Sequence, residues 1–317
     1  MGKHIYYKAA IAATMLLLAV APATSAHSRH AVTASPVVSP RVPSSMTFCE
    51  KKIDLDRADI FERFDRELTS VAYTHGNTLL TIKRANKYFP VMAPILKRNG
   101  IPADVLYLAC VESYLSPRAY SGAKAAGVWQ FLASTAKEYG LEVTDEVDER
   151  YNLEKATDAA CRYLKKAYQK YGDWPTAMAS YNGGQGRISS ELDNQLVDNA
   201  FDLFLTEETQ RYVFRIMAMK AVMENPAVFG YVIQDASQLY QPVDVDIVTV
   251  SESVESWPEW AKAHGITYSQ LREENPWIRA RKLTNKENKT YNVRVPREKA
   301  LLRSHQHPKA YNDKWVN

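Results

Sequence analysis

Between Asp56 and Pro226 the apolar residues recur at helical spacing, and this periodicity constrains the fold more than any other feature of the chain. The clearest case runs from Asn152 to Gly172, because Asn152 is suited to cap a helix and Gly172 to end one. The apolar face of this segment consists of Ala156, Ala160, Tyr163, Leu164, Ala167 and Tyr171. No stretch of the block requires a strand, so the sequence predicts a mainly α domain.

Other segments of the block support this prediction. The start of the block has an apolar stripe made of Ile60, Phe61, Phe64, Leu68 and Val71. One or two helices are expected from residue 78 to Gly100, broken near Pro90 and Pro94. A further helix is expected over residues 125–140, where Gly140 would end it.

The pattern changes after Gln241. The stretch VDVDIVTV, residues 243–250, alternates at period two, as a strand does, and TYNVRVP, residues 290–296, has the same character. Two short helical segments lie between them, at residues 254–265 and 267–276. The sequence therefore predicts a small α+β domain with the order βααβ after the helical block.

The N-terminal residues have the pattern of a secretory signal. Lys3 and Lys8 precede an apolar run from Ala9 to Ala21, and small residues suited to cleavage end at Ala26. The run is short for a membrane span, which takes roughly 20 residues, although an uncleaved anchor is an alternative. We expect residues 1–26 to be a signal peptide, 27–55 a flexible Ser/Pro-rich linker and 298–317 a polar tail.

Charge and cysteine content narrow the possible functions. Loss of Lys3 and Lys8 with the signal lowers the net charge from +4 to +2, which gives no basis for nucleic-acid binding. One pair among Cys49, Cys110 and Cys161 could form a disulfide in an oxidising compartment, although apolar surroundings favour buried thiols for Cys110 and Cys161. The histidines show no metal spacing beyond a weak HQH in the tail, so we expect neither metal nor cofactor.

Glu112 is the residue whose position suggests chemistry. It ends the apolar run IPADVLYLACVE and precedes a loop rich in small residues, SGAKAAGVWQF. A carboxyl group that must protonate a leaving oxygen near neutral pH needs a raised pKa, and an apolar setting raises it. The alternative is an ordinary solvated acid at a helix end. The nearby acids from Glu138 to Glu149 are interpreted as capping and ion-pairing residues.

Four short motifs occur in order: VES at Glu112, SGAKAAGVWQF, SYNGGQG and ETQRY. Together they resemble the lytic transglycosylases of the lysozyme-like superfamily, in glycoside hydrolase family 23, and in particular its membrane-bound murein transglycosylases. The resemblance covers residues 56–226. Residues 244–296 resemble a degenerate LysM module, although the usual glycine after the first strand is missing.

The resemblance implies a lysozyme-like all-α catalytic domain at residues 56–235, a LysM-like domain at 243–297 and catalysis by Glu112 alone. It implies substrate contacts by Ser121, Gln130, Tyr181 and Asn182, with Tyr212 orienting the acid. The side chains expected near sugar in the LysM-like domain are Tyr268, Asn275 and Trp277. Core packing is the alternative role for the tyrosines, and loop hydrogen bonding for Ser121 and Gln130.

The implied activity is cleavage of the β-1,4 bond between N-acetylmuramic acid and N-acetylglucosamine, with a 1,6-anhydro product. One alternative is a goose-type lysozyme that hydrolyses the same bond, with Asp145 or Asp148 as the first candidates for its base. Another is an inactive wall-binding protein. The expected partner is peptidoglycan and not nucleic acid, and the chain is expected to be a monomer. The expected location is the periplasm or outer membrane of a Gram-negative bacterium.

Overall fold

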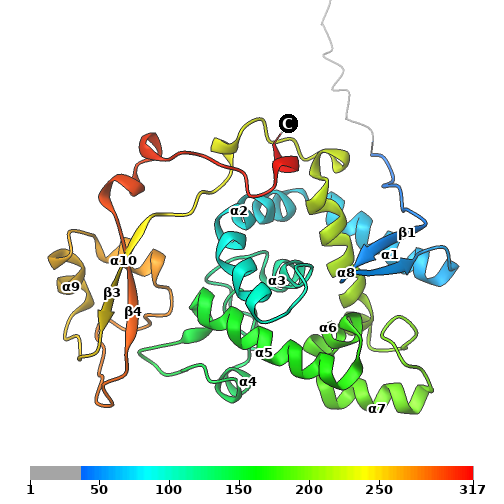
Figure 1. Cartoon of the computed structure of the whole chain (residues 1–317), viewed down its shortest axis with the longest axis horizontal. Helices are drawn as coiled ribbons and strands as arrows, with labels where there is room; N and C mark the ends of the chain where they lie inside the picture. The colour runs from blue at the N-terminus through cyan, green and yellow to red at the C-terminus, as the bar shows by residue number, and fades with distance from the viewer. Residues whose placement is uncertain (1–36, 317) are drawn as a thin grey trace, which may run out of the picture. The chain divides into compact units, whose positions relative to one another are not determined.

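The computed structural model describes residues 37–316, and from Ser39 onward the chain forms one compact unit (Figure 1). The expected signal peptide lies outside the described residues. The unit starts with a hairpin of β1 (Ser45–Phe48) and β2 (Lys51–Asp54). The helices of the first block are α1 (Ala58–Tyr73), α2 (His75–Arg98), α3 (Val105–Ser113), α4 (Ala133–Glu138), α5 (Leu153–Tyr171), α6 (Trp174–Gly183), α7 (Gln185–Gln195) and α8 (Glu207–Glu224).

The hairpin differs from the linker expected over residues 27–55. Phe48 is fully buried in the core of the helical block, and the backbone N–H of Cys49 donates to Asp104 at 2.6 Å. Cys49 and Glu50 form the two-residue turn, with φ of 48° and 65°. Only residues before the hairpin therefore remain candidates for a linker.

Helix α2 runs without interruption past Pro90 and Pro94, where breaks were expected. Both prolines are exposed and lie four residues apart, so they share the solvent face of the helix. The backbone hydrogen bonds that proline removes are therefore lost where water can replace them. The buried face of α2 includes Ile82, Phe89 and Met92.

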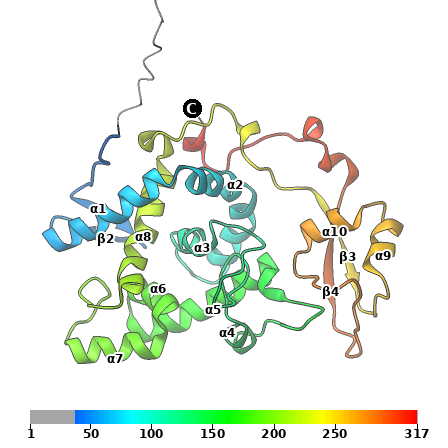
Figure 2. The same ribbon diagram turned by 180° about the vertical axis from the view of Figure 1, so that it is seen from behind.

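Helix α3 lies at the centre of the helical block, between α2 and α5 in both views of Figures 1 and 2, and it packs on α8. Leu108, Ala109 and Cys110 are completely buried, which agrees with the apolar sequence of this helix. Helix α1 also packs on α8, with Ile60, Phe64, Leu68 and Val71 inward as expected and Phe61 43% exposed.

The stretch from Ala125 to Phe131 is a loop, and not the first turns of a helix as expected. Isolated bridges pair Ala126 with Tyr120 and with Phe131, and Gln130 has a left-handed φ of 50°. Helix α4 therefore starts only at Ala133. We call residues 119–131 the 119–131 loop.

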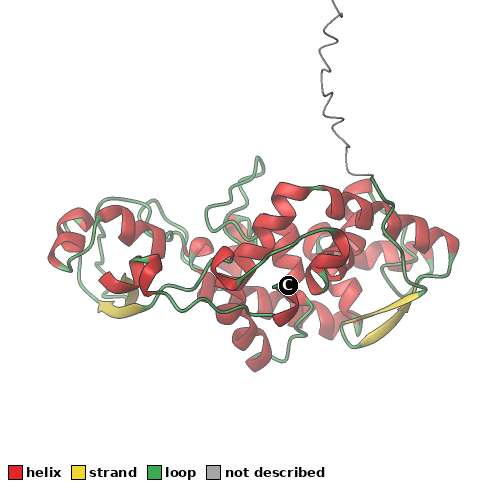
Figure 3. Cartoon of the chain, turned by 90° about the horizontal axis from the view of Figure 1, so that it is seen from above, coloured by secondary structure: helices red, strands yellow, loops and turns green. Residues whose placement is uncertain are grey.

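The second part has the predicted βααβ order. Strand β3 (Val245–Val250) pairs antiparallel with β4 (Tyr291–Pro296), with Val245 opposite Pro296 and Val250 opposite Tyr291. Helices α9 (Trp257–Ala263) and α10 (Tyr268–Glu274) lie between them in the sequence. Among the described residues, Figure 3 shows strands (yellow) only in this part and in the β1–β2 hairpin.

The two parts share buried residues. The core of the βααβ part is built on Trp257, Leu271 and Val293, and it includes Val147 and Tyr151 of the helical block. The backbone N–H of Asp148 donates to the carbonyl of Trp277 at 2.9 Å. The backbone N–H of Arg279 donates to the carbonyl of Glu146 at 2.8 Å. The residues 142–151 therefore belong structurally to both parts.

The C-terminal residues pack onto the helical block and do not form a free polar tail. Trp315 is 1% exposed, and its Nε1 donates to the carbonyl of Met223 at 2.6 Å. The ring of Tyr311 meets that of Phe89 edge-on at 5.5 Å. Residues 298–316 contain short 3-10 turns between these contacts.

All three cysteines carry free thiols that are buried. Burial raises the pKa of Cys161 to about 12 and that of Cys110 well above its ordinary range. The expectation of buried free thiols at Cys110 and Cys161 is confirmed. Within residues 37–316, no helix is both long and apolar enough to span a bilayer.

Candidate active site

Glu112 lies one residue before the end of α3. The chain leaves the helix through Tyr114 and Leu115, which have left-handed φ values of 51° and 53°. This turn stops the helix directly after the acid. Because most of α3 is buried, the Glu112 side chain is a polar group near the end of an apolar helix, and it is itself partly buried.

Tyr212 holds the carboxyl group of Glu112. It lies on α8, is 2% exposed, and its hydroxyl donates a short hydrogen bond to Oε1 of Glu112. The pKa of Glu112 is raised from 4.5 to about 7, and burial is the largest cause. The charge of Glu208 raises this pKa further, while the Tyr212 hydrogen bond and the Arg215 charge lower it. Near pH 7 the protonated and ionised forms of Glu112 are therefore present in comparable amounts.

Tyr181 is the second tyrosine near the acid. Its hydroxyl donates to the carbonyl of Trp129 at 2.7 Å, and its ring meets those of Phe131 and Tyr163 at 5.9 and 5.1 Å. Burial and the negative charge of Glu112 raise the pKa of Tyr181 well above its ordinary value. The hydroxyl therefore stays protonated at neutral pH and keeps its role as a donor.

Gln130 and Ser121 both lie in the 119–131 loop. The Nε2 of Gln130 donates to the carbonyl of Gly127 at 2.9 Å, which closes the left-handed turn. The Oγ of Ser121 accepts the backbone N–H of Ala125 at 3.1 Å. Both side chains are only partly buried, so each retains hydrogen-bonding capacity toward solvent.

Asn182 follows Tyr181 on α6 and is exposed. Among the residues that the structure describes, no hydrogen bond joins Asn182, Ser121 or Gln130 directly to Glu112. The structure therefore brings Tyr181 and Tyr212 to the acid. It places the other three at a solvent-facing surface. Asn182 directly follows Tyr181, and Gln130 directly follows Trp129, whose carbonyl accepts from Tyr181.

An ion-pair network behind the acid was not foreseen from the sequence. Glu67 on α1 is completely buried and accepts from Arg211 at 2.6 Å and from Arg215 at 3.2 Å. Arg215 also pairs with Glu208 at 3.0 Å. This network fixes the position of the positive charge that lowers the pKa of Glu112. A glutamate inside an otherwise apolar helix face was the available signal.

Arg150 was also not predicted from the sequence, and it holds the 119–131 loop in place. It forms a buried pair with Asp148 at 2.7 Å and donates to the carbonyls of Lys124 at 2.9 Å and Phe131 at 3.1 Å. A Cβ on Gly127 would lie 1.9 Å from the Arg150 carbonyl oxygen, so only glycine fits there. The interpretation of Asp148 and its neighbour Glu149 as capping and pairing residues is confirmed.

Asn275 and Trp277, expected near sugar, are instead structural. Asn275 is completely buried and bonds the backbone of Leu271 and Arg294. Trp277 is 3% exposed and stacks on Tyr291 at 5.6 Å. Their burial removes both from contact with a ligand, whereas Tyr268 remains partly exposed.

Comparison with known proteins identifies both parts. Residues 91–200 match the transglycosylase SLT domain, and residues 246–299 match the soluble lytic transglycosylase C-terminal LysM-like domain. The first match contains Glu112, Ser121, Gln130, Tyr181 and Asn182 and ends before Tyr212. These matches confirm the expected fold class, a lysozyme-like helical domain followed by a LysM-like one.

Two relatives carry related descriptions. The membrane-bound lytic murein transglycosylase D of Escherichia coli strain K12 is 32% identical over 187 residues, which are 57% of this chain and 40% of that protein. The peptidoglycan transglycosylase gp16 of Escherichia phage T7 is 40% identical over 95 residues, 29% of this chain and 7% of that protein. The chain thus spans well under two thirds of either relative.

Proposed function

Since the chain carries a transglycosylase SLT domain followed by a LysM-like domain, we propose that it is an exported peptidoglycan lytic transglycosylase. Its substrate is the β-1,4 bond between N-acetylmuramic acid and N-acetylglucosamine, and its product carries a 1,6-anhydro end. The observation that carries this proposal is the partly buried Glu112, with a pKa of about 7 and a carboxyl group held by Tyr212.

In the first step, protonated Glu112 gives its proton to the glycosidic oxygen. The bond from that oxygen to C1 of the muramic sugar breaks, and the N-acetylglucosamine unit leaves with a hydroxyl group. General acid catalysis of this kind typically contributes about 10²–10⁴-fold to the rate. A pKa near 7 suits this step, since a large fraction of the acid is protonated at neutral pH.

In the second step, the ionised Glu112 accepts the proton of the muramic C6 hydroxyl. The C6 oxygen bonds to C1 and closes the anhydro ring, so no water is consumed and the acid regains its proton. An intramolecular hydroxyl in the right position can reach an effective molarity on the order of 10⁵ M or more, which favours it over water.

The hydrogen bond from Tyr212 stabilises the carboxylate between the two steps. Tyr181 holds the 119–131 loop beside the acid through its hydrogen bond to the Trp129 carbonyl. Ser121, Gln130 and Asn182 would contact the sugars from the solvent-facing surface. The LysM-like domain would add contacts to the wall. These roles are part of the proposal.

The ion pairs of two other acids support an intramolecular route over hydrolysis. Glu208, whose charge acts on Glu112, is paired with Arg215, and Asp148 is buried against Arg150. A carboxylate that already pairs with arginine would have to break that ion pair before it could activate a water molecule. This argues against Asp148 as the base of a goose-type hydrolase.

The decisive experiment is mass analysis of the products released from purified sacculi by the full chain. We expect muropeptides one water lighter than lysozyme products, and no release by the Glu112→Gln variant. Reducing-end products that carry heavy oxygen from labelled water would show that the enzyme hydrolyses the bond and would contradict the proposal. Strong sacculus binding without turnover would replace it with a wall-binding function.

The proposed location is the periplasm, free or associated with the outer membrane. Fractionation of a Gram-negative host that produces the full chain tests it, together with mass analysis of the mature N-terminus. Cleavage after Ala26 and recovery outside the cytoplasm are expected. An intact N-terminus in the cytoplasm would contradict export.

A further inference from the structure

A cleft of about 930 Å³ opens where the two domains meet, and we call it the interdomain cleft. Its walls are Arg118 and Tyr120, just before and at the start of the 119–131 loop, the segment from Val143 to Tyr151, and helix α10 with the residues after it. Tyr120 is 59% exposed and directly precedes Ser121. The cleft therefore adjoins the loop that carries two of the candidate sugar contacts.

The walls of the cleft are held in place by backbone contacts between the domains. Val147 and Ile278 form an isolated antiparallel bridge, and the hydrogen bonds at Asp148 and Arg279 flank it. The carboxylate of Glu146 accepts the backbone N–H of Thr284 at 2.6 Å. These bonds fix the distance across the cleft, so that it is formed before a ligand arrives.

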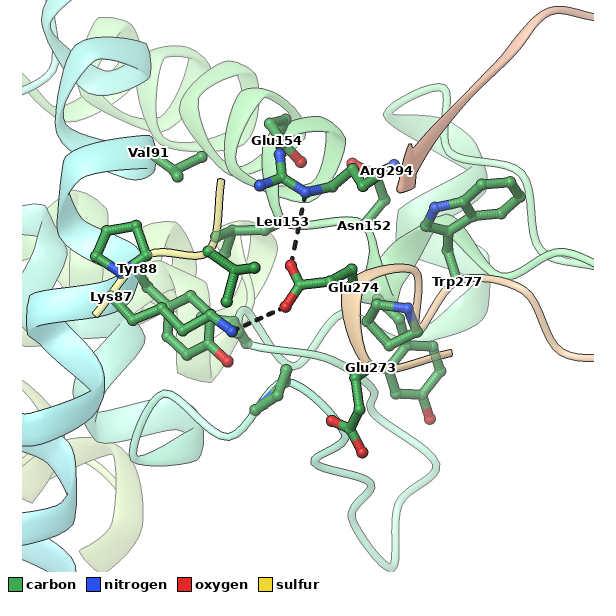
Figure 4. A pocket seen from close by; sticks show the side chains of 16 residues that line it. Lys87, Tyr88, Val91, Asn152, Leu153, Glu154, Glu273, Glu274, Trp277 and Arg294 are labelled. Carbon is green, nitrogen blue, oxygen red and sulfur yellow. Dashed lines mark hydrogen bonds and ion pairs between the residues drawn. The ribbon is translucent and has the colours of Figure 1, made fainter. Parts of the chain in front are cut away.

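Helix α10 is also anchored through Glu274, which is not among the residues that line the cleft (Figure 4). Glu274 lies between Lys87 at 3.1 Å and Arg294 at 3.9 Å, and Arg294 also pairs with Glu154 at 2.9 Å. These ion pairs link α10 to α2 directly and to α5 through Arg294, beside a cavity of about 70 Å³.

The charges that line the interdomain cleft leave arginine in excess. Four arginines face three carboxylates there, a net charge of +1. Two of the arginines are already paired: Arg150 with Asp148 at 2.7 Å, and Arg118 with Glu273 at 2.8 Å. Arg272 and Arg279 remain, and within the described residues neither has a carboxylate within salt-bridge distance. Asp145, at the exposed edge, is the remaining acid.

Tyrosine rings hold both of these guanidinium groups. Arg272 lies over the ring of Tyr268 at 5.6 Å and donates to its hydroxyl at 2.8 Å, while Arg279 lies over Tyr151 at 4.3 Å. The Nε of Arg272 is buried and has no hydrogen-bond partner in the described part of the chain. An arginine fork held on an aromatic face is preorganised for a carboxylate, which it binds with two parallel hydrogen bonds.

We propose that the interdomain cleft binds the carboxylate-bearing peptide attached to the glycan strand, with Arg272 and Arg279 as its anion contacts. This rests on the proposed function, because it assigns a second part of the same substrate. The sugars themselves are bound at the Glu112 surface. The peptide branches from the strand beside Tyr120 and enters the cleft, where its acidic groups supply the carboxylate partners that the two arginines lack within the described residues.

Kinetics on two substrates test the assignment. The first is glycan strands that carry peptides, and the second is the same strands after an amidase has removed them. For the double variant Arg272→Gln/Arg279→Gln we expect KM on the first to rise by about tenfold or more, since hydrogen bonds to charged groups are strong. KM on the second should change less than about twofold. Arg281→Gln, an exposed arginine of the same loop outside the cleft, is the matched control.

An equal rise of KM on both substrates, or no rise on peptide-bearing strands, would overturn the assignment. A binding measurement separates this outcome from failure of the proposed function. The free stem peptide is titrated into the full-length Glu112→Gln chain, where no cleavage is needed, and compared with the same peptide after amidation of its carboxylates. Binding of the first only, lost in the double variant, is expected. Equal affinity for both peptides, or none for either, contradicts the cleft site.

Discussion

The hydroxyl of Tyr212 donates to Oε1 of Glu112 across a separation of 100 residues in the sequence. The bond joins the end of α3 to the first turns of α8, two helices that pack through apolar side chains elsewhere. Burial raises the pKa of Glu112, whereas this hydrogen bond lowers it. The protonation state of Glu112 therefore depends on the balance between burial and this hydrogen bond.

The first prediction concerns folding stability and pH. Between its ordinary pKa of 4.5 and the folded value of about 7, Glu112 binds more protons in the folded chain than in the unfolded one. The free energy of unfolding therefore falls as pH rises through this window, by up to about 3 kcal/mol. Glu112→Gln does not titrate, so its stability relative to wild type should rise over the same window and level off above pH 7. Urea unfolding from pH 4 to 9 measures it, and a flat difference would show that the acid is not buried.

The second prediction isolates the Tyr212 hydroxyl. Tyr212→Phe removes a hydrogen bond to a charged group, worth about 1.5–3 kcal/mol, so kcat/KM at neutral pH should fall about tenfold or more. The pKa of Glu112 should move further upward, and the alkaline limb of the pH–rate profile should move with it. Tyr171→Phe is the control, because its hydroxyl bonds the Gln185 carbonyl away from the acid. An unchanged alkaline limb with a folded variant would argue against the contact.

The third prediction concerns the close contact at Gly127. Its φ is +78°, and an added Cβ would overlap the Arg150 carbonyl oxygen, so Gly127→Ala should destabilise the protein by about 3 kcal/mol or more. Gly122 lies in the same loop, and a Cβ added there would meet no atom within 4 Å, so Gly122→Ala should change stability by less than about 0.5 kcal/mol. Thermal unfolding compares the two, and similar melting temperatures would contradict the contact.

The fourth prediction concerns the Asp148–Arg150 pair. Arg150→Met leaves a buried carboxylate unpaired, which should cost about 3–5 kcal/mol, and the double variant Asp148→Asn/Arg150→Met should recover part of it. Both variants also lose the hydrogen bonds from Arg150 to the carbonyls of the 119–131 loop, so the loop should become more mobile and KM should rise. Arg187→Met, at an exposed arginine of α7, is the control. Additive losses in the double variant would mean that the two side chains are not coupled.

The fifth prediction tests the packed C-terminal residues. Trp315→Ala removes a buried ring and its hydrogen bond to Met223, so we expect a loss of about 3–5 kcal/mol in the free energy of unfolding. Lys314→Ala changes the neighbouring exposed residue and should be nearly neutral. Equal stability of both variants would agree with the polar tail expected from the sequence and contradict the packing of Trp315.

The sequence predicted the helical block, the βααβ order and Glu112 at a helix end, because each follows from local periodicity and from Gly and Pro positions. It missed the β1–β2 hairpin for a local reason. Its two-residue turn places Cys49 and Glu50 at positive φ, where the usual residues are Asn and Gly. The hairpin is retained by burial of Phe48 and by Asp104, which lies far away in the sequence.

Non-local contacts also explain the other differences. The loop at Gln130 is left-handed because Arg150 and Ser113 bind its carbonyls, and helix propensity does not include such partners. The network at Glu67 joins α1 to α8, so its charges look unrelated along the chain. Asn275 and Trp277 resembled exposed ligand contacts, yet tertiary packing buries both.

The buried thiols make this chain its own stability sensor. Only the thiolate reacts with alkylating reagents, and burial both hides these groups and raises their pKa. Cys49 lies in the hairpin turn, Cys110 in α3 and Cys161 in α5, so each becomes reactive only when its own element opens. The labelling rates of the three thiols therefore report separately on the opening of the hairpin, of α3 and of α5, without any introduced probe.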